Sequence, residues 1–223
     1  MMIADPKALN RQQTALRQAL EGATDPAQAL QLCCYHHTLL HSAKINLKEN
    51  WSYEDEILDD LSEPQFRRIP SNEEHSIVWC LWHLARIEDT AMNLLIAGTP
   101  SVFEQDEWFT RLGVPFYDSG NEMTAHEIAR LSAEIDLAAL RDYRAAVGTR
   151  TQAIIAGLGE ADLRRKVDPR RLQRVLEAGF LRPEARGIAD YWSKRDFTGL
   201  LLMPATRHNI VHLNEAARLK KKR

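Results

Sequence analysis

Three histidines have the residue type and spacing that could hold a metal ion. His208 and His212 lie four residues apart, so in a helix both imidazoles share one face, one turn apart. His83 lies in an apolar segment, Trp-Cys-Leu-Trp-His-Leu-Ala-Arg, with helical periodicity. Three nitrogen ligands from two helices leave a coordination position open, which is typical of a catalytic metal site.

A second histidine pair competes with this interpretation. His37 and His41 have the same four-residue spacing, so spacing alone does not choose between the pairs. The later pair is favoured because three inward-facing imidazoles are costly to bury unless a cation shares them. His37 is a weaker candidate, either as a fourth ligand or as a group behind the ligands. The stripe that carries the later pair is Leu201, Ala205, His208, His212, Glu215 and Leu219.

Charged residues near the three histidines suggest the supporting chemistry. Glu215 and Glu88 are candidate catalytic residues, because a carboxylate can orient an imidazole or carry a proton. Glu215 is the better placed, about one turn after His212. Arg207 and Arg86 are candidate cofactor-binding residues, since an arginine can hold the carboxylate of an acidic thiol with two hydrogen bonds.

The elements that must position these residues are helical almost throughout. Strictly alternating apolar runs are missing and glycine is scarce. Periodicity, with predicted capping boxes of Ser71 with Glu74 and of Thr124 with Glu127, indicates four long helices and a short amino-terminal one. Pro204 is expected at a kink or in a first turn. This pattern predicts an all-α four-helix bundle with extra short helices. The predicted helices are 6–22, 26–51, 52–61, 71–98, 105–112, 124–157 and 198–219, with further short ones in 158–197 that are expected to pack outside the core.

Length and composition narrow the class of protein. A chain of 223 residues is expected to form a single domain, 1–223. The net charge of −2 argues against nucleic-acid binding, and the basic residues 220–223 are expected to be a solvated tail. Three cysteines, with no apolar run long enough to cross a bilayer and no signal peptide, favour a cytoplasmic protein without membrane contact.

The histidine pattern resembles a known family. Trp-x-x-x-His on one long helix and His-x-x-x-His on the last resemble the DinB-like family of four-helix-bundle metalloenzymes. Four segments resemble one branch of it more closely: His-Ser-Ile-Val-Trp-Cys-Leu-Trp-His-Leu-Ala-Arg-Ile-Glu-Asp, Gly-Asn-Glu-Met, Tyr-Arg-Ala-Ala-Val-Gly and Leu-Leu-Leu-Met-Pro-Ala-Thr-Arg-His-Asn. The resemblance covers most of the chain, and segments 1–25 and 158–197 are additions to the family pattern.

The resemblance implies a cofactor and a class of reaction. It implies a divalent metal ion, nickel or zinc, held by His83, His208 and His212. Family members with assigned activities use small thiols as cosubstrates, as S-transferases, or isomerise maleylpyruvate. The leading hypothesis is therefore a metal-dependent enzyme, a thiol-dependent transferase or a hydrolase, that acts on a small-molecule substrate with a low-molecular-weight thiol.

The alternative hypothesis is a non-catalytic homodimeric bundle whose metal site is structural or vestigial, acting in a stress response. The two hypotheses differ in the site they require. An enzyme needs an open coordination position that faces a solvent-reachable pocket, whereas a structural site is sealed. Trp79 and Trp82 form an apolar strip that either packs against an outer helix or forms the interface of the hypothetical homodimer.

Overall fold

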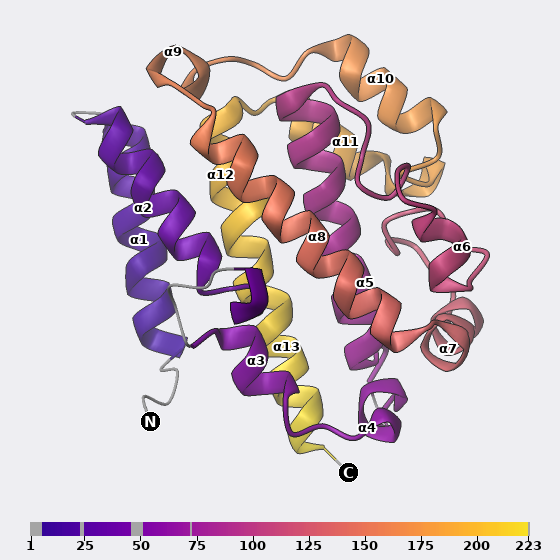
Figure 1. Cartoon of the computed structure of the whole chain (residues 1–223). Coiled ribbons are helices and arrows are strands. Elements are labelled where there is room, and N and C mark those ends of the chain that lie inside the picture. The colour runs from indigo at the N-terminus through magenta and orange to yellow at the C-terminus, as the bar shows by residue number, and fades with distance from the viewer. Residues whose placement is uncertain (1–5, 23–24, 46–50, 72, 223) are drawn as a thin grey trace.

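A computed structural model describes residues 6–22, 25–45, 51–71 and 73–222 (Figure 1). These residues are mainly helical and contain no strand, only an isolated bridge between Lys166 and Asp196. The prediction of an all-α fold is therefore confirmed. No helix among them combines the length and the apolar character that crossing a bilayer requires.

Four long helical segments form the bundle. The second segment packs against the third and the fourth, and the first packs against the third. An additional helix, α1 (Pro6–Gly22), lies along the outside of the first and the fourth (Figure 1). In chain order the four segments are α2 (Pro26–Thr38), α5 (Ile77–Asp89) continued by η2 (Thr90–Ala97), α8 (Leu137–Ala156), and α12 (Phe197–Leu202) continued by η4 (Met203–Arg207) and α13 (His208–Lys221).

Short helices connect and cover these four segments. They include the short helices predicted within 158–197, where α9, α10, η3 and α11 are found. The short helices are η1 (Ala43–Ile45), α3 (Tyr53–Leu58), α4 (Glu63–Arg67), α6 (Trp108–Leu112), α7 (Ala125–Glu134), α9 (Glu160–Leu163), α10 (Pro169–Glu177), η3 (Pro183–Ala185) and α11 (Arg186–Ser193).

The helix predicted over 26–51 is too long, because α2 ends at Thr38. The chain then turns, and the carbonyl of Leu40 accepts a hydrogen bond from the Arg144 guanidinium instead of continuing the helical ladder. The turn brings the rings of His37 and His41 together, with their centroids 4.3 Å apart. Periodicity alone did not reveal this end, since the apolar pattern continues past it.

The capping box predicted at Ser71 and Glu74 is wrong. Helix α5 begins after Ser76, whose hydroxyl accepts a hydrogen bond from the backbone N–H of Trp79. The helix begins where the chain becomes buried, since every residue from 76 to 96 is buried. The predicted end is confirmed, since Gly98 closes the segment with a φ of 74°, which favours glycine.

The helix predicted from Thr124 to Gly157 is two helices, α7 and α8. The capping box of Thr124 and Glu127 is present as predicted. At the break the Arg67 guanidinium donates to three carbonyl groups at and just after the end of α7. Asp136 then caps α8, because its carboxylate accepts a hydrogen bond from the backbone N–H of Ala139.

The last segment bends at Pro204, as predicted. Proline has no backbone N–H, and here it opens a π-helical turn between α12 and α13. Side chains satisfy the carbonyl of Leu202, which accepts hydrogen bonds from the Thr206 hydroxyl and the Gln13 amide. The turn ends directly before His208, so it sets the direction in which that histidine faces.

A buried histidine links α1 to the bundle. The Nε2 of His36 lies 3.0 Å from the Oε1 of Gln13, and burial, helped by the neighbouring His37, lowers the pKa of His36 from 6.5 to about 4. Between these pH values the unfolded chain binds more protons at His36 than the folded chain does. The contribution of neutral His36 to the free energy of unfolding is therefore fully present above pH 6.5 and is lost as the pH falls toward 4.

We therefore expect a non-titrating His36→Gln variant to show a weaker dependence of unfolding free energy on pH. Between pH 6.5 and 4.5 the slope should decrease by about 1.4 kcal/mol per pH unit, the value for one proton. Urea unfolding at several pH values measures it. His126→Gln is the control, because His126 is exposed and should leave the slope unchanged. Equal slopes for the parent and His36→Gln would contradict the prediction.

Candidate metal centre

His83 lies on α5 with its ring buried in the bundle. Its Nδ1 lies 2.7 Å from the backbone carbonyl oxygen of Ser119. A carbonyl only accepts, so Nδ1 carries the proton and Nε2 keeps its lone pair. Burial, with a further contribution from His212, lowers the pKa of His83 from 6.5 to about 3, so the ring is neutral at physiological pH.

His208 and His212 face His83 from α13, one turn apart. The ring centroid of His83 lies 4.8 Å from that of His208 and 4.8 Å from that of His212. The ring centroids of His208 and His212 are 4.6 Å apart. The Nδ1 of His212 lies 2.7 Å from a carboxylate oxygen of Glu215. That Nδ1 therefore donates, which leaves the Nε2 of His212 as the nitrogen that can bind an ion.

The three rings fit a shared cation. Their candidate ligand atoms all lie within 4.8 Å of one another, and the Nε2 atoms of His83 and His208 are 3.1 Å apart. Burial, together with the other two rings, holds the pKa of His208 well below its usual range. Converging lone pairs of neutral imidazoles are the donor set that a divalent ion such as zinc prefers.

Glu215 supports this arrangement from behind His212. Its second oxygen accepts a hydrogen bond from the Nδ1 of His75 at 2.8 Å. Although burial raises its pKa, these two hydrogen bonds hold the pKa of Glu215 well below its usual range, so it is a carboxylate. The ring of Trp79 stacks between His75 and His83, with centroid distances of 3.5 and 4.7 Å. The rings are thus held in fixed orientations.

The loop that supplies the Ser119 carbonyl is itself anchored. The indole N–H of Trp82 donates to the carbonyl of Asp118 at 3.1 Å. Gly120 follows with a φ of 85°, and a Cβ there would lie 3.2 Å from side-chain atoms of both Trp79 and Trp82. Only glycine combines that backbone conformation with so close an approach to α5.

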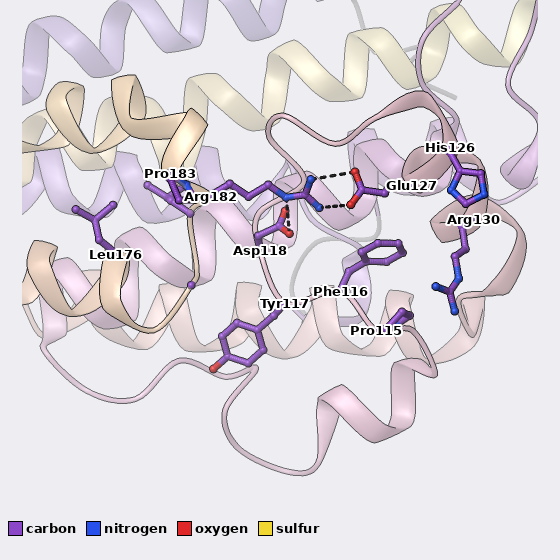
Figure 2. Close-up of a pocket in the computed structure, with 12 residues that line it drawn as sticks. Pro115, Phe116, Tyr117, Asp118, His126, Glu127, Arg130, Leu176, Arg182 and Pro183 are labelled. Atoms are coloured by element: carbon purple, nitrogen blue, oxygen red, sulfur yellow. Dashed lines mark hydrogen bonds and ion pairs between the residues drawn. The ribbon is translucent and has the colours of Figure 1, made fainter.

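Arg182 fixes the same loop from the opposite side. Figure 2 shows its guanidinium reaching across a cavity of about 650 Å³ to the carboxylates of Glu127 and Asp118. The backbone N–H of Ser119 also donates to the carbonyl of Phe180 at 3.0 Å. Arg182, Asp118 and Glu127 are thus paired with one another across this cavity, and their ion pairs hold the loop in place.

A pocket of about 370 Å³ opens directly onto the three histidines. Its other walls come from α5, from the loop residue Asn121, and from α11 and the π-helical turn. The wall provided by α11 and that turn consists of Gly187, Ile188, Tyr191, Trp192, Met203 and Pro204. The converging nitrogen atoms are therefore at the floor of a cavity that a small molecule can enter.

A comparison with known families assigns most of the chain to one of them. The family described as the DinB superfamily matches residues 46–216, which include all three histidines. The chain belongs to the DinB superfamily. No curated protein matches the chain.

The competing pair of this DinB superfamily protein lies in a different environment. The Nε2 atoms of His37 and His41 lie 2.8 and 2.9 Å from the two oxygens of Glu88, and all three side chains are fully buried. The side-chain amide of Asn209 donates to the same carboxylate at 2.9 Å. Despite burial, His41 and His37 hold the pKa of Glu88 well below its usual range.

These three residues also have the geometry of a metal group. Their hydrogen bonds favour another interpretation, because an imidazole nitrogen beside a carboxylate oxygen carries a proton and offers no lone pair. We therefore describe His37, His41 and Glu88 as the carboxylate clasp. It joins α2 to α5, Asn209 links the same carboxylate to α13, and Glu88 does not line the pocket.

The two arginines predicted to bind a cofactor do not line the pocket. Arg86 is buried beside α8, where it donates to the Tyr143 hydroxyl at 3.1 Å and lies over the ring of Phe103 at 3.8 Å. Arg207 bonds Asn10 of α1 and lines a different cavity. Neither guanidinium faces the three histidines.

Cys80 and the two tryptophans are also part of the packing. Burial, with the nearby Glu215 carboxylate, raises the pKa of Cys80 well above its usual range, so its thiol stays protonated. Trp79 and Trp82 are buried within the chain, which corresponds to packing rather than an open apolar strip.

Sequence patterns did not predict several residues that support or line the site. Ser119, His75 and Arg182 act through hydrogen bonds over long sequence distances, which no local pattern records. Tyr191 and Trp192 come from 158–197, which was interpreted as helices packed outside the core. An available signal was that this segment contains closely spaced aromatic residues among charged ones.

Proposed function

We propose that this protein is a divalent-metal-dependent enzyme that binds a small thiol at the three-histidine centre, in the manner of an S-transferase. The observation that carries the proposal is the convergence of three imidazoles, two of them with Nδ1 engaged by a hydrogen-bond acceptor, in the lining of one pocket. We propose His83, His208 and His212 as the ligands of zinc or nickel.

When bound, the ion supplies a Lewis acid that favours the deprotonated form of a coordinated thiol or water. The chain's own residues have separate roles. The Ser119 carbonyl and the Glu215 carboxylate hold the Nδ1 protons of His83 and His212, so both Nε2 atoms stay directed at the ion. We propose Glu215 as a positioning residue, because both of its oxygens are engaged by histidines.

The pocket favours this proposal over a purely structural metal site. A structural site is closed by four protein ligands, whereas here three histidines meet an open cavity. Apolar walls also exclude water, which strengthens electrostatic interactions at the reacting atom. The small-molecule substrate and the homodimer remain predictions.

The test uses the full-length, untagged chain loaded with Co²⁺. We expect about one bound ion per chain and a sulfur-to-cobalt absorption band that grows and saturates when 2-mercaptoethanol is added. Ethylene glycol is the control, because it lacks only the sulfur atom. An absence of bound cobalt, or a cobalt spectrum that the thiol does not change, would contradict the proposed function.

A further inference from the structure

We propose that the pocket above the candidate metal centre selects an uncharged ligand with a flat apolar body, rather than an acidic one. This inference rests on the proposed function for the ligand's donor atom, because that atom has to reach the three histidines. The selection itself depends on the walls of the pocket, so it can be tested with and without metal.

The first observation is the charge of the walls. No lysine, arginine, aspartate or glutamate lines this pocket among the described residues, and its polar side chains are the three histidines, Asn121, Tyr191 and the indoles of Trp79 and Trp192. Away from the three histidines, an ionised carboxylate that enters such a cavity loses its hydration without gaining a cationic side chain as a partner. The walls therefore disfavour an acidic ligand.

The second observation concerns the nearest arginines. Arg86 is held by the Tyr143 hydroxyl and the ring of Phe103, away from the pocket. Arg195 lies 4.1 Å from the ring of Tyr191, but it does not line the pocket. Reaching an acidic ligand would require each guanidinium to give up these contacts.

The third observation is the shape and lining of the cavity. Its volume of about 370 Å³ is near the small end for ligand pockets, which run from roughly 300 to 1,000 Å³. The rings of Trp79, Tyr191 and Trp192 lie among aliphatic side chains of the wall, including Ile87 and Ile188. Aromatic walls favour a flat ring, which packs face to face or edge to face.

The test compares matched probes on the full-length chain. Without metal, benzyl alcohol is compared with benzoate through the fluorescence of Trp79 and Trp192, which line the pocket. With Co²⁺, benzyl mercaptan is compared with 4-(mercaptomethyl)benzoate through the sulfur-to-cobalt band. We expect the neutral probe to bind at least about 10-fold more tightly in both comparisons.

A charge introduced into the wall provides a matched variant. Ile188→Lys places a cation in the pocket and should reduce the preference for the neutral probe by at least about 10-fold. Val211→Lys adds the same charge to an exposed position of α13 that does not line the pocket, and should leave the preference unchanged.

The outcomes separate this inference from the proposed function. Equal or tighter binding of the acidic probe, or no binding of either probe to the metal-free chain, would overturn the inference. Failure to bind cobalt would overturn the proposed function only, because the metal-free comparison still measures the selection by the walls.

Discussion

Replacing His208 or His212 with alanine should abolish stoichiometric metal binding. Structural zinc sites bind with about 10–16 kcal/mol, so one of three or four ligands is worth about 4 kcal/mol, or about 10³-fold in Kd. His83→Ala should have the same effect, because its Nε2 lies 3.1 Å from that of His208. Metal content after dialysis and competition with a chelator measure the loss.

Variants of the neighbouring groups distinguish ligands from supporting residues. Glu215→Gln should weaken metal binding by about 10- to 100-fold, the range for residues that orient a metal-bound imidazole. His37→Ala should leave one ion per chain, since His37 belongs to the carboxylate clasp. Full metal retention in the His208 and His212 variants, or loss in the His37 variant, would refute this assignment.

The sequence alone predicted the class of fold and the segments that carry the histidines. Helical periodicity around His83 and the four-residue spacing of His208 and His212 are local patterns, and the bundle follows from burying the corresponding faces. The bend at Pro204 was also predictable, because proline cannot continue the backbone ladder.

The breaks in the helices were not predictable from periodicity. The chain turns near Leu40, where Arg144 donates to a backbone carbonyl group. It turns again before Asp136, where Arg67 donates to backbone carbonyl groups at the end of α7. Each arginine comes from a distant part of the chain. Local propensity cannot record such a contact, so the predicted helices ran on through both breaks.

The choice between the two histidine pairs also needed the structure. Both pairs have the same spacing, and they differ only in what lies at each ring nitrogen. Ser119 and Glu215 hold the Nδ1 protons in one group, which directs lone pairs inward. In the other group the Glu88 carboxylate accepts hydrogen bonds from the Nε2–H groups of His37 and His41. The chemistry of each group depends on its tertiary partners.

This difference predicts a large effect of Glu88 on stability. Glu88→Leu should remove the acceptor of three buried N–H groups, those of His37, His41 and Asn209. Leaving one partner of a buried charged network unpaired costs about 3–5 kcal/mol. We expect a decrease of that size in the free energy of unfolding, measured with urea on the metal-free protein.

The control for that measurement is Glu74→Leu, because Glu74 is exposed and its loss should change the unfolding free energy by no more than about 0.5 kcal/mol. A triple replacement, Glu88→Leu with His37→Leu and His41→Leu, should recover part of the lost stability, since it removes two of the stranded donors. If the carboxylate clasp instead held an ion, the parent would bind two ions per chain and Glu88→Leu would lose one of them. That result would replace the hydrogen-bonded clasp with a second metal site.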